Sequence, residues 1–275
     1  MLRLWRDRLT LALAPDRIVL VRGSGGLRPK LLAKAIVPVG GADSGWKPAV
    51  DTLAKTLKSD KQWQDASVSA VLANAFVRYQ LVPWSDEIGG TEEREAYVRQ
   101  SFTQVYGDAA AEWAYVVSDV PRGAAWFACA IDRDLLLLLE QSVTQTNSKL
   151  VSVAPHIMPA FNSARRAIQR KDCWFVQIEK DRLLLAMITG GHWQMLSSRK
   201  IVGERWQQEL PLLLEREWRL HGMNQVPREV MISAPEAHQA ALDGAGKWVF
   251  HWLRPALQYG LAGRAEAPYA MALGA

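Results

Sequence analysis

The chain has 275 residues, of which 49% are hydrophobic and 22% charged. This length predicts about two domains, and the ordinary composition excludes a disordered, collagenous or disulfide-stapled protein. The net charge of +5 is mild for this length, and the basic residues are scattered among acids, apart from Arg165, Arg166, Arg170 and Lys171; we therefore expect no nucleic-acid partner.

The chain also lacks the signals of a membrane or secreted protein. No apolar run approaches the ~20 residues that span a bilayer. The N-terminus is basic, but the apolar stretch that follows it is too short for a signal peptide. We therefore expect a cytoplasmic protein.

The first part of the chain is predicted to be a β-meander followed by a helix and a strand. Turn residues at Pro15-Asp16 and Gly23–Gly26 separate three short β-type runs, at 9–13, 18–21 and 31–39. Apolar residues then recur every three or four positions from Trp46 to Leu57, which predicts an amphipathic helix. A strand follows at 67–72, and we expect 76–82 to be its hairpin partner.

Two helices and two strands are predicted in the middle of the chain. Thr91 is expected to cap a helix whose apolar stripe is Tyr97, Phe102 and Val105 and which Gly107 ends. The runs 112–118 and 124–131 are predicted strands. Asp132 is expected to cap a helix at 135–146, with its leucines buried on most sides.

The same kind of β-meander returns in the second half. A short strand at 150–154 and a helix at 158–168 come first. Three β-type runs follow, at 173–178, 182–188 and 192–201. After them we expect a helix at 206–220, a strand at 230–233, a second helix at 236–245 and a last strand at 248–252. We expect a short alanine-rich tail at the end.

This duplicated order of elements resembles the plan of the actin-like, ribonuclease H-like superfamily. The stretches 68–73, 79–83, 130–133 and 149–161 further resemble the actin-like assembly proteins of type IV pili (PilM), of the mannose-sensitive pilus (MshI) and of type II secretion (the cytoplasmic part of GspL). The resemblance implies an α/β, two-lobed actin-like fold with duplicated β-β-β-α-β units and an inserted α+β subdomain. Residues 1–148 would form the first lobe, with the inserted subdomain at about 67–146, and residues 149–275 the second.

The turns that hold phosphate in active members of this superfamily are altered here. Those turns need an aspartate in the strand and glycine in the turn, which lets backbone N–H groups reach the phosphate. The first meander instead has Pro15, which has no N–H. The second has Gln177 at the aspartate position and Glu179 at the glycine position, and the third stretch contains Pro235. We expect Asp16 and Asp181 to be turn residues and the phosphate turns to be inactive.

No other group of residues predicts an enzyme. Cys129 and Cys173 lie in apolar segments and are expected to be buried thiols. The five histidines have no metal-type spacing, and His238 beside Glu236 is only a pair at the start of a helix. The sequence therefore predicts no catalytic, cofactor-binding or metal-binding residue and no cofactor.

The resemblance implies a non-catalytic scaffold protein of a type IV pilus-like or type II secretion-like platform. Such a protein would lie in the cytoplasm at the inner face of the bacterial inner membrane, bound to the cytoplasmic tail of a membrane partner. The first alternative is a nucleotide-binding actin-like ATPase or sugar-kinase relative. The second is a ribonuclease H-like nucleic-acid binder, which the near absence of carboxylates on the predicted strands disfavours.

Overall fold

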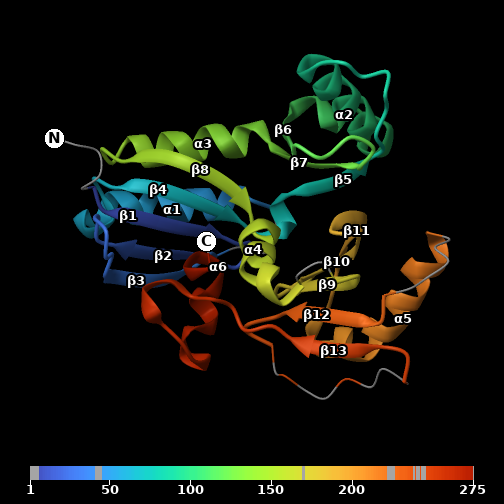
Figure 1. The fold of residues 1–275 in the computed structure, drawn as a ribbon. Coiled ribbons are helices and arrows are strands. Elements are labelled where there is room, and N and C mark those ends of the chain that lie inside the picture. Colours follow the sequence, from blue (N-terminus) through green and yellow to red (C-terminus); the bar gives the residue numbers. More distant parts are fainter. Residues whose placement is uncertain are drawn as a thin grey trace. The chain divides into compact units, whose positions relative to one another are not determined.

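The structure is a computed structural model that describes residues 6–40, 45–168, 171–221, 227–237, 239, 242 and 246–274. The strands are β1 (Arg8–Leu13), β2 (Arg17–Gly23), β3 (Leu31–Pro38), β4 (Ser67–Leu72), β5 (Arg78–Val82), β6 (Trp113–Val117), β7 (Trp126–Asp132), β8 (Lys149–Pro155), β9 (Cys173–Ile178), β10 (Arg182–Thr189), β11 (His192–Lys200), β12 (Glu229–Ser233) and β13 (Val249–Trp252). The α-helices are α1 (Lys47–Ser59), α2 (Thr91–Tyr106), α3 (Arg133–Thr144), α4 (Ile157–Ile168), α5 (Trp206–Leu220) and α6 (Ala270–Leu273). Figure 1 shows these elements along the chain.

The chain forms two compact units, each made of separate segments. The first contains Met1–Val77, Asp132–Ser163 and Pro255–Ala275, and the second contains Arg78–Ile131 and Ala164–Arg254. The sequence prediction assigns β8 and the C-terminal segment to the second lobe, whereas they are part of the first unit. Most of the predicted inserted subdomain is part of the second unit. The division into lobes at 148 and 149 stays a prediction.

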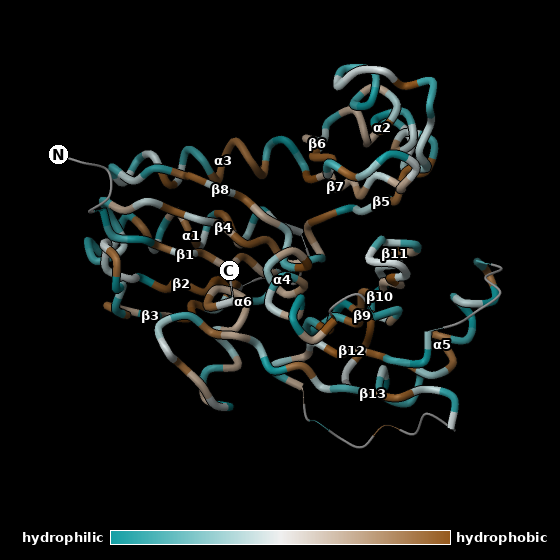
Figure 2. Tube along the Cα trace, in the orientation of Figure 1, coloured by the Kyte–Doolittle hydropathy of each residue, from teal (hydrophilic) through white to brown (hydrophobic). Residues whose placement is uncertain are grey.

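The first unit is built on a five-stranded mixed sheet in the order β3-β2-β1-β4-β8. Strands β1, β2 and β3 are the predicted antiparallel meander, and β4 and β8 add parallel strands beside β1. Helix α1 buries Val50, Leu53 and Leu57 of the expected stripe, and it packs against α3 and β2. Trp46, the first residue of that stripe, is the N-cap of the helix and is half-buried. Parts of β2 and β4 carry the hydrophobic colour in Figure 2, in keeping with a buried sheet centre.

A C-terminal segment covers one face of this sheet. Met271, Ala272 and Leu273 of α6 pack with Ala12 and Val19 of the sheet. Because side chains alternate along a strand, the neighbours of Ala12 point to the opposite face. The sequence predicted only an alanine-rich tail here, so the role of this segment in the core is a correction.

Two further contacts fix this segment at the sheet. Lys34 on β3 donates to the Glu266 carboxylate at 2.6 Å and lies 4.5 Å from the centre of the Tyr269 ring. A Cβ atom on Gly23 would lie 2.1 Å from the Tyr259 hydroxyl. Gly23 therefore leaves room for Tyr259. The sequence predicted Gly23 only as a turn residue, so this packing role was not predicted.

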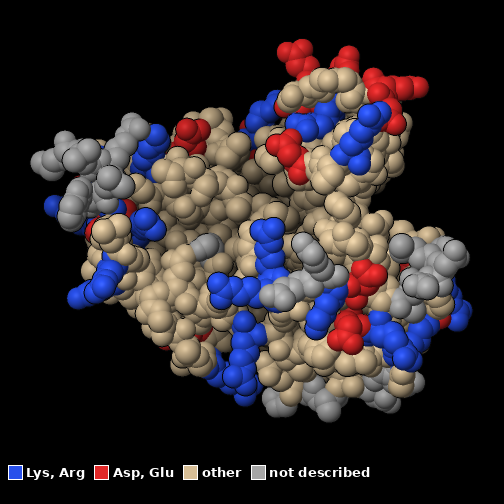
Figure 3. All heavy atoms as spheres, in the orientation of Figure 1, with Lys and Arg blue, Asp and Glu red and all other residues tan. Residues whose placement is uncertain are grey.

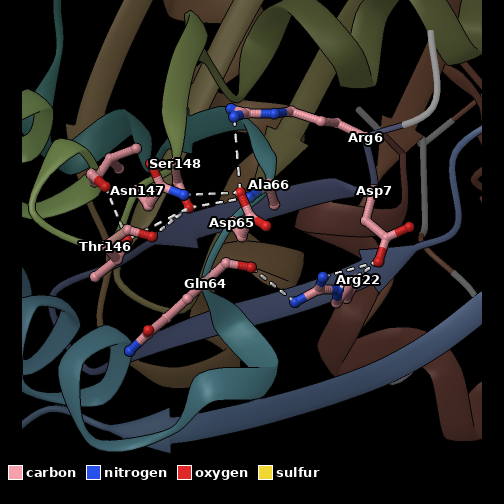
Figure 4. A network of polar contacts seen from close by, with 10 residues as sticks. Arg6, Asp7, Arg22, Gln64, Asp65, Ala66, Thr146, Asn147 and Ser148 are labelled. Atoms are coloured by element: carbon pink, nitrogen blue, oxygen red, sulfur yellow. Dashed lines mark hydrogen bonds and ion pairs between the residues drawn. The ribbon is translucent and has the colours of Figure 1, made fainter. Parts of the chain in front are cut away.

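A polar network joins the amino-terminal ends of the parallel strands of the first sheet (Figure 4). Arg22 donates to the Asp7 carboxylate at 2.8 and 3.0 Å and to the carbonyl oxygen of Gln64 at 3.0 Å. Asp65 and Asn147 precede β4 and β8, both have positive φ angles of 58° and 55°, and their side chains are hydrogen-bonded at 3.1 Å. The network therefore fixes the starts of three strands that are far apart in sequence.

The second unit repeats the first sheet. Its order is β11-β10-β9-β12-β13, with an antiparallel meander and two added parallel strands. Trp174 is fully buried, and its indole N–H donates to the Pro227 carbonyl at 3.1 Å. Helix α5 packs Leu210 and Leu214 into the same core. The two duplicated β-β-β-α-β units and two separate sheets confirm the predicted fold class.

The second unit also holds a three-stranded sheet in the order β5-β7-β6, covered on one face by α2. Strand β5 pairs with β7, so the predicted hairpin between 67–72 and 76–82 is wrong. Gly90, not Thr91, is the N-cap of α2, and Val105 is 66% exposed. The buried residues of α2 are Val98, which the predicted stripe did not contain, and Phe102, which it did.

Three further predictions have different outcomes. Asp132 caps α3 as predicted and accepts from the backbone N–H of Asp134 at 2.9 Å. The expectation for the leucines of α3 is wrong in part, because Leu137 is 50% exposed on the side of the helix turned away from the core. Residues 236 and 237 lie in a turn and not in the expected helix, of which 238, 240, 241 and 243–245 lie outside the described residues.

Candidate functional site

The altered phosphate turns lie at the carboxyl ends of the parallel strands of each sheet. There the turn between β1 and β2 and the turn between β9 and β10 take the place of the two phosphate turns. Backbone N–H groups are the main donors to phosphate in such turns. Their hydrogen bonds therefore decide whether a phosphate has partners.

The first turn is a closed hairpin. The N–H of Ala14 donates to the Arg17 carbonyl at 2.9 Å, and the Asp16 carbonyl accepts from Val39 at 2.8 Å. Pro15, at the tip, has no N–H to offer. Within this turn, the Ala14 N–H is thus already hydrogen-bonded, and Pro15 has no N–H to donate to a phosphate.

The second turn repeats the first bond for bond. The N–H of Glu179 donates to the Arg182 carbonyl at 2.9 Å, and the Asp181 carbonyl accepts from Ile201 at 2.9 Å. Gln177, at the expected aspartate position, is completely buried. The second turn is therefore also closed, with a carboxylate at the position where glycine is expected.

A short sequence signal marks both turns. Each turn ends in Asp-Arg followed by apolar strand residues, at Asp16-Arg17 and at Asp181-Arg182. In each turn, the carbonyl of this aspartate receives the bond from the third strand. The repeated pair is therefore associated with closing the meander and is a signature of the duplication.

The third stretch follows β12. Ser233 lies opposite Gln177 in the register of β9 and β12. The chain then turns, with the Ala237 N–H donating to the Ala234 carbonyl at 3.2 Å, and Pro235 between them has no N–H. This stretch thus lacks the pair of glycines with which nucleotide-binding members approach their ligand.

We expect no binding of ATP with Mg²⁺ in a titration calorimeter, because these turns offer too few free backbone donors. An actin-like ATPase titrated under the same conditions is the positive control. A micromolar affinity, about 8 kcal/mol of binding free energy, would show that other groups bind the nucleotide and would contradict this prediction.

The remaining reactive side chains do not form a second site in the described residues. Burial raises the pKa of both Cys129 and Cys173 to about 11, so neither thiol is an activated nucleophile. Cys173 is buried as expected, whereas Cys129 is half-buried. Within those residues no three His, Cys, Asp or Glu side chains gather as metal ligands. His238 and Arg170 lie outside this part of the chain.

Charge is unevenly distributed over the surface. Acidic side chains gather over the region of α2 in Figure 3, where the exposed acids include Glu92, Glu93 and Glu95. The chain as a whole is basic, so its positive charge comes from other segments. In the described chain, no helix is long and apolar enough to cross a membrane.

Comparison with solved structures identifies the fold. No protein-family model and no curated protein matches the sequence. The cytoplasmic domain of EpsL, an inner-membrane component of the type II secretion system of Vibrio cholerae, matches with a TM-score of 0.60 and 14% identity over 98% of this chain and 95% of that one. The PilM–PilN type IV pilus biogenesis complex matches with a TM-score of 0.59 and 14% identity over 82% of this chain and 80% of that one.

A third structure names the fold directly. A Bacteroides thetaiotaomicron protein with an actin-like ATPase fold and unknown function matches with a TM-score of 0.57 and 12% identity over 98% of this chain and 96% of that one. The chain thus has the actin-like fold. The resemblance to actin-like assembly proteins of pili and type II secretion is confirmed at the level of the fold.

Proposed function

We propose that this protein is a non-catalytic scaffold of a type IV pilus-like or type II secretion-like inner-membrane platform. The observation that carries the proposal is the match over nearly the whole chain to the EpsL cytoplasmic domain. The PilM–PilN complex adds support, because its name pairs a protein of this fold with a second component of pilus biogenesis.

The partner in this proposal is the cytoplasmic tail of an inner-membrane protein. Tails beside membrane spans are short and enriched in Lys and Arg on the cytoplasmic side. An extended or short helical peptide binds through apolar anchors and backbone pairing at a strand edge. We propose that the groove for such a tail lies in the first lobe, as the family resemblance implies. The protein would then lie in the cytoplasm at the inner face of the membrane, held there by its partner.

The closed turns support the non-catalytic part of the proposal. Ala14 and Glu179 use their N–H groups within the turns, and an enzyme acting on nucleotide would need such donors for phosphate. The alternative is a nucleotide-binding ATPase or sugar-kinase relative. It predicts a rise in melting temperature on adding ATP and Mg²⁺, and our proposal predicts none.

The experiment that tests the proposal has two stages. The purified chain is used to capture proteins from detergent-solubilised membranes of its own source, and a peptide with the tail sequence of the captured membrane protein is then titrated into it. We expect saturable binding of that peptide and none of a scrambled peptide of equal composition. Vesicles of anionic lipid without protein serve as the control for direct membrane attraction, which is expected to be weak and salt-sensitive.

Two results would contradict the proposal. One is the absence of any pilus or secretion component among the captured proteins when those components are present in the membranes. The other is equal binding of the tail peptide and its scrambled version. Genes for a pilus or secretion platform beside the gene for this chain would support the proposal independently.

A further inference from the structure

The hairpin that joins β2 and β3 displays apolar and basic side chains together. Leu27, in the loop between the two strands, is 103% exposed, and Leu32, at the irregularity in their pairing, is 53% exposed. Arg28, Pro29 and Lys30, which lie between the two leucines in the sequence, are exposed as well. Burial of a leucine is favourable, yet the fold leaves both of these in water beside positive charges.

Hydrogen bonds hold the base of this hairpin in place. The Ser24 N–H donates to the Lys30 carbonyl at 2.9 Å, and the Ser24 hydroxyl accepts from the Lys30 N–H at 2.9 Å. The Gly25 N–H donates at 3.2 Å to the Asp7 carboxylate, to which Arg22 also donates. The exposed side chains are thus carried by a loop with fixed ends, which lowers the entropy lost when they bind a surface.

The polar network of Figure 4 brings further basic residues to the same edge of the first sheet. The carbonyl of Gln64 accepts from Arg22, and its side chain donates to the Leu57 carbonyl at 2.8 Å, at the end of α1. The Lys149 N–H, at the start of β8, donates to the Ala66 carbonyl at 2.9 Å. The exposed basic residues of this basic edge are Arg6, Arg28, Lys30, Lys58, Lys61 and Lys149.

Acidic side chains do not balance the basic edge. In the described segments 6–8, 24–32, 58–66 and 145–149, the acids are Asp7, Asp60 and Asp65. Asp7 is bonded to Arg22, and Asp60 accepts from the Gln62 N–H at 3.0 Å. Figure 3 shows several Lys and Arg side chains along its left-hand side, where Figure 1 has the hairpin of β2 and β3. The edge therefore carries a net positive charge.

We propose that the basic edge and Leu27 form a contact with the anionic lipid surface of a membrane. Binding to such a surface combines burial of apolar side chains at the boundary of headgroups and acyl chains with attraction of Lys and Arg to anionic lipid. The edge lies at the amino-terminal ends of β1 and β4, and the altered phosphate turn lies at the carboxyl end of β1. A membrane at this edge therefore does not cover that turn. The contact rests on the proposed function only in placing the protein beside a membrane.

Flotation of the purified full chain with lipid vesicles tests the contact without any partner protein. We expect binding to vesicles of phosphatidylglycerol and phosphatidylcholine at about 50 mM NaCl, and binding at least about tenfold weaker at 500 mM, because salt screens the charges. Vesicles of phosphatidylcholine alone are expected not to bind. Leu27→Ala is expected to weaken binding about fivefold, and Arg28→Gln combined with Lys30→Gln about twentyfold.

The second unit supplies matched controls. Leu212 on α5 is 72% exposed, and Arg165 and Arg166 on α4 are exposed. Leu212→Ala, and Arg165→Gln combined with Arg166→Gln, make the same kinds of change in apolar surface and in net charge outside the basic edge. Both are expected to bind anionic vesicles as the wild type does.

Three outcomes would overturn the membrane contact. The first is no binding to anionic vesicles at low salt, and the second is equal binding to neutral vesicles. The third is equal weakening by the control variants, which would show a general effect of charge. If the Arg28 and Lys30 variant loses a captured membrane protein but keeps vesicle binding, the edge is a protein interface and the contact is also wrong.

The vesicle test and the tail-peptide titration fail independently. Saturable binding of the tail peptide without vesicle binding would remove the lipid contact and leave the scaffold proposal standing. Vesicle binding that depends on Leu27 and the basic edge, without any captured pilus or secretion component, would support the contact and contradict the scaffold proposal.

Discussion

Replacing Arg199 by alanine is expected to reduce the free energy of unfolding by about 3–5 kcal/mol, because a buried charge loses its partner. Arg199 on β11 pairs with Glu217 on α5, and the Glu217 side chain is only 7% exposed. Without the guanidinium, the carboxylate remains between helix and sheet with no counter-charge from this pair. Urea denaturation followed by tryptophan fluorescence measures the loss.

A double variant separates the missing charge from the missing packing. In Arg199→Met combined with Glu217→Leu, both charges are gone and apolar side chains fill the space, so most of the stability is expected to return. The exposed pair of Arg122 and Asp86 is the control, and Arg122→Ala is expected to change stability little. A double variant as unstable as Arg199→Ala would contradict this account.

Replacing Leu273 by alanine is expected to cost about 2–5 kcal/mol, the range for a leucine removed from a well-packed core. Leu273 is fully buried in the cluster that α6 forms with Ala12 and Val19 of the first sheet. The cost combines lost transfer free energy with the cavity left against the sheet. Thermal and urea unfolding of the full chain measure it.

Leu27 is the matched control for this substitution. It is fully exposed in the loop between β2 and β3, so Leu27→Ala is expected to leave stability unchanged. Equal stability of the Leu273→Ala variant and the wild type would show that α6 does not contribute to the folded core.

Local patterns predicted the duplicated sheets well. Each meander has turn residues between alternating runs, and the helix after it has apolar residues at helical spacing, as from Trp46 to Leu57. Such elements are determined by residues that are close together in the sequence, so a local sequence pattern can predict them.

Pairing at long range was beyond these patterns. Strand β5 looked like a hairpin partner of β4 because the two are close in sequence, but it pairs with β7 about fifty residues away. Helix α6 has only four residues, too few to show a helical period. Its place in the core depends on a tertiary contact with Val19 and its neighbours.

The sequence predicted which residues occupy the phosphate turns, but not how those turns are hydrogen-bonded. Pro15 and Glu179 showed from the sequence that the phosphate turns are altered. That the two turns close with the same hydrogen bonds required coordinates.

The C-terminal cover of the first sheet has a consequence for synthesis of the chain. A ribosome releases residues in order, and domains generally fold as their segments emerge. The meander of β1, β2 and β3 appears first, yet the apolar face that includes Ala12 and Val19 receives its cover only when residues 270–273 have been translated. The second unit, which starts later, has all its segments before that point. The apolar face of the first sheet is therefore uncovered until residues 270–273 have emerged from the ribosome.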